Sequence, residues 1–351
     1  MLDAATAAIG SVSGRVLCSV REHLANRAAP QRARVFATRS RRAWVTSDTR
    51  PPLPIDLIAR VSDLIDTELT RRLPAIERLV VDPAILDVAL PLSGAATETG
   101  FAVLPRGSRT PVDGRLLRFF THWRQRGEPT DFDLSALLLD ADFHYAGHVS
   151  WTRYHDAGGA VYSGDITNAP EGATEFIDIP LDRVDATHVV PQVNIYSGEG
   201  FDQVAESMFG WMLRDPAQAG APFEPRTVRT RSDMRGPGRV ALPILFSRDD
   251  HRRWTATWTH LYLHGSPRFN RTEDNRLSTA TLVRAITERR YLTVGHVVDL
   301  LARAGTEVAS WHPDQPFPEE PVTFLGLHQP EQLPAGSTAI TADRLNELIP
   351  D

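Results

Sequence analysis

The sequence contains no lysine. All 38 basic residues are arginine, in a chain of 351 residues with 44 acids and a formal net charge of −6. P-loop nucleotide-binding proteins, pyridoxal-phosphate enzymes and Ser-Lys hydrolases each depend on a lysine side chain, so the sequence excludes all three.

Cysteine and long apolar runs are also scarce. The single cysteine, Cys18, excludes a disulfide framework and any zinc or iron–sulfur site built on several cysteines, and it fits a reducing compartment. No run of about 18 apolar residues occurs, so we expect no transmembrane helix. Residues 1–14 lack the basic start and the cleavage-like end of a signal peptide, and we therefore expect a cytoplasmic protein.

Charge is distributed unevenly along the chain. Residues 131–215 hold 3 arginines and 15 acids, a net charge of −12, whereas residues 1–130 and 216–290 carry +6 and +7. A solvated acidic surface explains such a block, and so does a cation site, because hard cations prefer carboxylate oxygens.

The arginine-rich segments raise the question of nucleic-acid binding. Arginine suits phosphate recognition, but no known nucleic-acid-binding motif is present, and the acidic block would repel phosphate. Pairing of these arginines with the acidic block accounts for them better. We therefore do not expect nucleic acid as a partner, and an arginine-driven nucleic-acid binder stays only as an alternative.

Hydrophobic periodicity changes along the chain. Residues 3–28 and 55–72 have the spacing of amphipathic helices, with a short predicted hairpin at residues 34–46 between them. Residues 278–290 and 293–304 have helical spacing again. Between these regions, alternating patterns separated by turn residues predict strands at residues 116–123, 132–139, 147–154, 161–162, 175–179, 188–196, 204–213, 239–246 and 254–263.

These patterns predict an α+β chain with three regions. An α/β N-terminal region (1–99) is followed by a central antiparallel β-sandwich (100–265) and a helical C-terminal region (266–351). Pro191 lies within a predicted strand and indicates an edge strand or a bulge there.

The acidic motif at residues 130–140, Thr-Asp-Phe-Asp-Leu-Ser-Ala-Leu-Leu-Leu-Asp, is the densest functional signal. Side chains alternate between the faces of a strand, so Asp131, Asp133 and Ser135 should share one face. Residues two apart are separated by about 6.6 Å, and carboxylates at that spacing can reach one ion. Two solvated acids on the outer face of a half-buried strand are the alternative. A second acidic stretch contains Asp165, after a glycine, and Glu175.

Several motifs in this part of the chain resemble the TerD family of tellurium-resistance and stress proteins. They are the acidic motif, Tyr162-Ser163-Gly164-Asp165, residues 176–181, Asn194-Ile195-Tyr196 and Phe201-Asp202-Gln203-Val204. Their order and spacing agree over about residues 100–265, and the flanks resemble extensions of longer actinobacterial TerD-domain proteins.

The resemblance implies a β-sandwich that binds calcium through clustered acids. The positions that match are Asp131, Asp133, Asp165 and Glu175. The chain departs from the family pattern in three places: Ser135 replaces an acid, Ile-Thr-Asn-Ala-Pro at residues 166–170 replaces a Gly/Asp/Glu-rich run, and Ser197 replaces an acid that is often present. Because affinity falls as ligand charge is lost, we expect at most one weak calcium site.

The 12 histidines form no recognisable catalytic or metal-binding motif. His144 and His148 are four residues apart but lack a third ligand in the sequence nearby, and neither a His-Glu-x-x-His nor a Gly-x-Ser-x-Gly motif occurs. We therefore predict a non-enzymatic, stress-associated binding or scaffold protein with protein partners. A metal-assisted hydrolase that uses acids such as Asp131 and Asp165 is the alternative.

Overall fold

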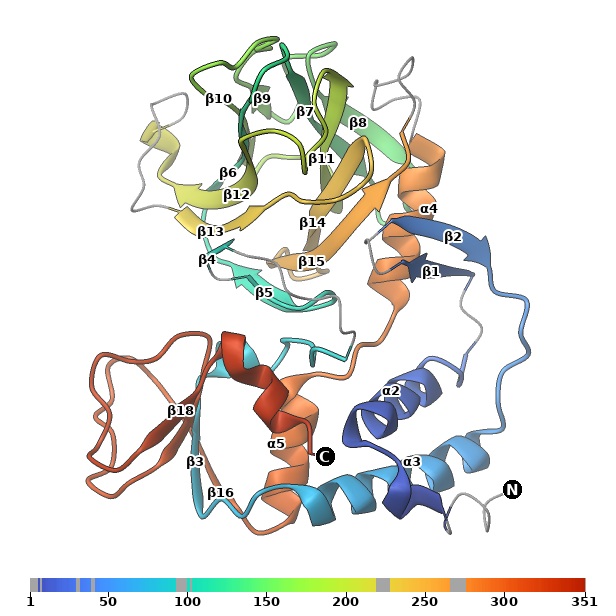
Figure 1. The fold of residues 1–351 in the computed structure, drawn as a ribbon, viewed down its shortest axis with the longest axis vertical. Coiled ribbons are helices and arrows are strands. Elements are labelled where there is room, and N and C mark those ends of the chain that lie inside the picture. Colours follow the sequence, from blue (N-terminus) through green and yellow to red (C-terminus); the bar gives the residue numbers. More distant parts are fainter. Residues whose placement is uncertain are drawn as a thin grey trace.

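The structure, a computed structural model, describes residues 6, 8–29, 32–38, 42–92, 100–101, 103–218, 228–265 and 276–350. Within these residues, two six-stranded antiparallel sheets form a sandwich, and a smaller α/β part lies below it (Figure 1). The first sheet has the order β4 (Gly100–Phe101), β13 (Val228–Asp233), β12 (Glu206–Arg214), β6 (Leu116–Arg124), β10 (Ala173–Pro180) and β9 (Val161–Tyr162). The second has the order β5 (Arg109–Val112), β15 (Trp254–Leu263), β14 (Val240–Arg248), β11 (His188–Ser197), β7 (Asp131–Leu139) and β8 (Tyr145–Val149).

Alternate residues of the long strands fill the space between the two sheets. Phe132 of β7 stacks on Trp123 of β6 with ring centroids 5.4 Å apart, and it meets Phe201 edge-on at 5.1 Å. Leu134 and Ala136 follow Phe132 on the same face and belong to the same buried cluster. The predicted antiparallel arrangement of the central region is therefore present, with period-two burial as its cause.

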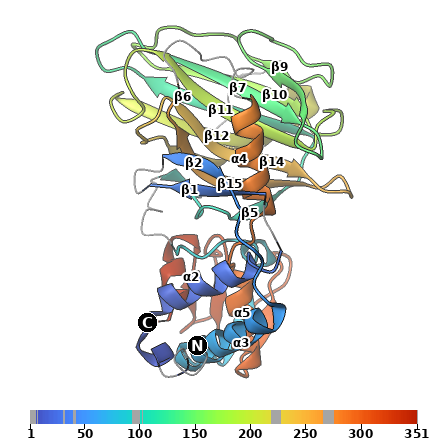
Figure 2. The ribbon, with the colours of Figure 1, turned by 90° about the vertical axis from the view of Figure 1, so that its right-hand side faces the viewer.

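The opposite face of β7 is also covered. Leu137 and Leu139 pack in a second apolar cluster with residues of helix α4 (Arg276–Glu288) and with Ala43 of the hairpin formed by β1 (Ala33–Ala37) and β2 (Ala43–Ser47). Figure 2 shows α4 and this hairpin beside the sandwich. All nine residues of β7 are buried, so the alternative of a half-buried strand with solvated acids is wrong. Segments remote in sequence supply the covering layer, which local patterns do not reveal.

The smaller part contains a parallel four-stranded sheet. Its order is β16 (Glu307–Ser310), β3 (Arg78–Val81), β17 (Thr323–Leu325) and β18 (Thr338–Ile340). Helices α2 (Gly14–Ala25), α3 (Ile55–Arg72) and α5 (Val294–Arg303) complete it, with short 3-10 helices η1 (Ile9–Ser11), η2 (Pro83–Ile85) and η6 (Ala342–Leu348); a further one, η3 (Pro216–Gln218), follows β12.

The prediction of a purely helical C-terminal region is therefore wrong. Strands β16, β17 and β18 lie in that region, and β16 and β17 pair with β3 from the N-terminal region. Strands of three or four residues are too short for a period-two signal, and the β3 partners are more than 200 residues away. The two flanks thus share one sheet rather than forming separate layers.

Among the remaining predictions, the helix at residues 55–72 is confirmed as α3, whereas the helix predicted at 3–28 is limited to α2 among the described residues. Pro191 lies in β11, a central strand. The pairing of β11 with β14 shifts register between Val189 and Val193, so the bulge alternative is confirmed. None of the described helices has the length and apolar content needed to cross a membrane.

The aromatic contacts of Phe132 allow a test of the core. Phe132→Ala should lower the free energy of unfolding by about 3–5 kcal/mol, because it removes a fully buried ring and leaves a cavity. Denaturant unfolding of the purified chain measures this. Ile55→Ala, at a side chain 70% exposed, should change it by less than about 0.5 kcal/mol. Equal effects of the two substitutions would contradict this packing.

Candidate metal centre

Strand β7 supplies two of the acidic side chains of the site. Asp131 and Asp133 lie at its start, on the face that also carries Leu137 and Leu139. Their exposed fractions are only 4% and 3%. Buried carboxylates need a cation, a hydrogen-bond donor or a proton to offset the loss of water.

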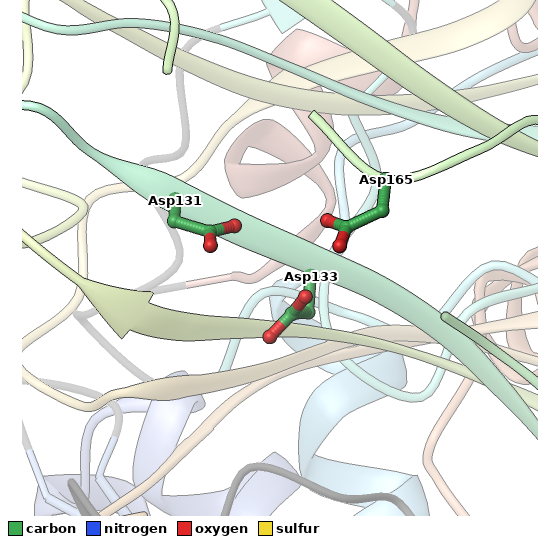
Figure 3. A group of neighbouring side chains, drawn as sticks. All are labelled: Asp131, Asp133 and Asp165. Carbon is green, nitrogen blue, oxygen red and sulfur yellow. The ribbon is translucent and has the colours of Figure 1, made fainter. Parts of the chain in front are cut away.

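Asp165 joins them from the loop between β9 and β10. It follows Gly164, whose φ of 123° lies in a region that L-residues rarely adopt, although a Cβ there would meet no atom within 4 Å. Backbone conformation, not crowding, therefore favours glycine before Asp165. Figure 3 shows the carboxylates of Asp131 and Asp133 on the strand and that of Asp165 facing them from the loop.

The three carboxylates are close enough to share one ion. One oxygen from each of Asp131, Asp133 and Asp165 lies within 4.8 Å of the other two. Two oxygens bound to the same calcium ion are at most about 5 Å apart, so this spacing fits a single cation. The cluster could thus hold a metal ion, and Asp165, which is exposed, leaves one side open to water.

Glu175, the fourth acid expected from the sequence, is not brought into this group. Its side chain is fully buried, and its Oε2 accepts a hydrogen bond from Leu134 N while Oε1 accepts one from Ile166 N, both at 2.9 Å. The carboxylate therefore joins strand β7 to the loop after β9. Because Leu134 follows Asp133 and Ile166 follows Asp165, Glu175 sets the spacing of the metal-binding acids without contributing to their group.

The charges of these acids oppose one another. Burial, with a further contribution from the Asp165 charge, raises the pKa of Asp131 to about 6. Burial also raises the pKa of Asp165, and it raises that of Glu175 to about 8. The Tyr162 phenol lies beside Glu175, and its pKa is raised by burial and then by the Glu175 charge. A bound cation would remove the repulsion within this set.

Asn194 is a candidate ligand that the sequence reasoning missed. It lies on β11 directly opposite Asp133, so both side chains project from the same face of the sheet. Asn194 is 1% exposed, and within the described chain neither its Oδ1 nor its Nδ2 has a hydrogen-bond partner. Asp131 Oδ1 is likewise buried without a partner there. Buried polar groups are nearly always paired, so these atoms indicate an additional ligand at this place.

Two of the three departures from the family pattern also lie at the site. Ser135 is buried, and its Oγ has no hydrogen-bond partner among the described residues. Ser197 pairs with Asp131 across β11 and β7, so an acid at this position would have been adjacent to the cluster. Two serines thus occupy places where carboxylates would add negative charge.

Histidine does not contribute to this group in the part of the chain that the structure describes. His148 Nδ1 lies 2.6 Å from the Tyr145 hydroxyl, and His144 Nδ1 lies 3.5 Å from an Asp140 oxygen. The donor set is therefore made of oxygen atoms.

No protein-family model matches the chain. No curated protein matches it either. A solved structure, described as "Crystal structure of unknown function protein SAV2460", matches with 22% sequence identity and a TM-score of 0.37, covering 45% of this chain and 94% of its own. A likeness at this TM-score carries no argument about function.

The raised pKa of Glu175 predicts a specific pH dependence of stability. Its folded-state pKa of about 8 exceeds the ordinary value of 4.5, so the folded protein retains a proton that the unfolded chain has lost. The free energy of unfolding should therefore fall as pH rises from about 4.5 to about 8, by at most about 1.4 kcal/mol per pH unit from this group.

Glu175→Gln should flatten this decline. Because Asp131 titrates lower, at about 6, the range from about pH 6.5 to 8 isolates Glu175. Denaturant unfolding with a metal chelator present measures the slope. Glu171→Gln, at an exposed position on the preceding turn, is the matched control and should keep the parent slope. An unchanged slope in Glu175→Gln would show that Glu175 is not protonated in the folded protein.

Proposed function

We propose that residues 100–265 form a TerD-like calcium-binding domain of a non-enzymatic, stress-associated binding or scaffold protein. The observation that carries the proposal is the approach of three carboxylates, two of them buried, to within 4.8 Å. Asn194, buried beside Asp133 with no partner for its amide among the described residues, supports it independently. The sequence resemblance supplies the family and the expectation of protein partners.

The chemistry of the donor set favours calcium. Calcium takes six to eight oxygen ligands at about 2.3–2.6 Å in flexible geometry, whereas zinc prefers four nitrogen or sulfur ligands and magnesium demands a near-ideal octahedron. Three carboxylates and one carboxamide supply oxygen atoms, and the open side at Asp165 leaves room for water. Four such groups fall short of a complete shell, which supports one weak site.

A metal-assisted hydrolase has less support. Such an enzyme needs a group that accepts a proton beside the metal-bound water. In the described residues no histidine joins the carboxylates, and both oxygens of Glu175 accept backbone hydrogen bonds. We therefore favour binding over catalysis.

Calcium should stabilise the folded protein through this site. A ligand that binds only the folded state raises the free energy of unfolding by about 2.7 kcal/mol at 100 times its Kd. Asp133→Asn should weaken calcium at least about 10-fold, because it removes one of three negative charges from the ion's shell. Calorimetric titration and thermal unfolding with calcium measure the two effects.

Asp142→Asn is the matched control, because Asp142 is an exposed aspartate just beyond the other end of β7. It should bind calcium as the parent does. The proposal fails if about 10 mM calcium, above the range of weak protein sites, neither releases heat nor raises the melting temperature of the parent.

Asn194→Leu should affect stability and calcium binding in opposite directions. Removing a buried amide without partners should raise the metal-free free energy of unfolding by about 1–3 kcal/mol, because its desolvation is no longer uncompensated. The same change removes a ligand oxygen and should weaken calcium binding. Unfolding in chelator and calorimetry in calcium give both values. Parent-like calcium affinity would exclude Asn194 from the shell.

A further inference from the structure

A cavity lies between the sandwich and the smaller α/β part, away from the acidic cluster. Its volume is about 340 Å³. The sandwich contributes Leu104, Trp211 and Trp258, and the C-terminal segment contributes Leu327, His328 and Ala342. In both views that segment, drawn in red, lies just below β5 (Figures 1 and 2). Ligand pockets occur preferentially at such junctions, with volumes of about 300–1,000 Å³.

The lining combines indole rings with a few polar groups. Trp211 is 5% exposed, and its Nε1–H is a buried donor with no acceptor among the described residues. Trp258, 1% exposed, adds a second indole to the lining. A buried donor without an acceptor is costly, so an oxygen atom from a bound molecule would satisfy it.

The charge of the lining is of one sign. Arg229 lines the cavity, and no Asp or Glu does so in the described chain. Arg229 also lies at an irregularity in the sheet: Trp211 pairs with Thr230 and Met212 with Val228, which leaves Arg229 opposite no residue. Bulges of this kind redirect side chains and are over-represented beside binding sites. Among the described residues, Arg229 forms no ion pair.

We propose that this cavity binds a small planar aromatic or heteroaromatic carboxylate. The two indoles contact the ring, the Trp211 Nε1–H donates to a ligand oxygen, and Arg229 supplies the positive charge. The volume admits a molecule of one or two fused rings and not an extended polymer. This site is independent of the proposed calcium site, since none of its lining residues belongs to the acidic cluster.

The test uses 2-naphthoate as the probe and the full chain, titrated by calorimetry in a metal chelator. The parent should bind one equivalent saturably, and 2-naphthamide, which lacks the charge, should bind more weakly. Trp211→Phe keeps the ring, removes the N–H donor and should weaken 2-naphthoate about 10-fold, as for one lost hydrogen bond to a charged group. Arg229→Met should weaken 2-naphthoate but not 2-naphthamide.

Matched controls separate this cavity from adsorption elsewhere. Arg231→Met changes a neighbouring exposed arginine of β13 that does not line the cavity, and it should bind as the parent does. Ala342→Leu and Ala84→Leu fill the cavity from two different segments, and each should abolish binding without lowering the melting temperature. Two filling variants protect the test from misfolding of one.

The proposal is overturned if the parent shows no binding at millimolar 2-naphthoate, or if a folded filling variant binds as the parent does. Equal losses in Arg229→Met and Arg231→Met would also overturn it, because general surface charge would then explain the binding. Asp133→Asn should bind 2-naphthoate like the parent, so failure here and failure of the calcium proposal are distinguishable.

Discussion

The burial of β7 on both faces is the constraint on which the rest of the structure depends. One face packs Phe132 and Leu134 into the sandwich, and the other packs Leu137 and Leu139 against α4 and the β1–β2 hairpin. The covering helix and hairpin come from opposite ends of the chain. A strand with two apolar faces thereby holds the flanks to the central sandwich, because each apolar face gains by exclusion from water.

The same strand begins with two buried aspartates. Asp131 and Asp133 occupy the face that Leu137 and Leu139 share further along, where water is largely excluded. Their carboxylates would be unfavourable there without a counter-charge. Glu175 adds to the strain on the local electrostatics while it joins β7 to the loop of Asp165. Proximity of the acids is thus enforced by backbone hydrogen bonds rather than by attraction between them.

Much of the sandwich could be predicted because its long strands carry strong period-two patterns. The strand of the acidic motif and the shared face of Asp131 and Asp133 follow directly from alternation. Asp165 was also foreseen as part of the site. Asn194 was not, because its position opposite Asp133 depends on the register of β11 against β7, and register is not written in either strand alone.

Glu175 shows the limit of reasoning from residue type. An acid near other acids is a reasonable ligand candidate, yet this one is oriented toward two backbone N–H groups. Composition likewise could not reveal the shared sheet of the two flanks, because β16 and β17 are short and pair with a strand far away in the chain. Nor could it reveal the cavity at the junction, which exists only where two parts meet.

The sequence by itself determined the excluded lysine chemistries, the acidic central block and the alternation that places two aspartates on one face. These properties depend on residue identity and on neighbours two positions apart. Only the tertiary structure decided that those aspartates are buried, that Asp165 meets them and that Glu175 stands aside. Those outcomes depend on strand register, on the covering helix and hairpin and on backbone hydrogen bonds, all of which join residues distant in the chain.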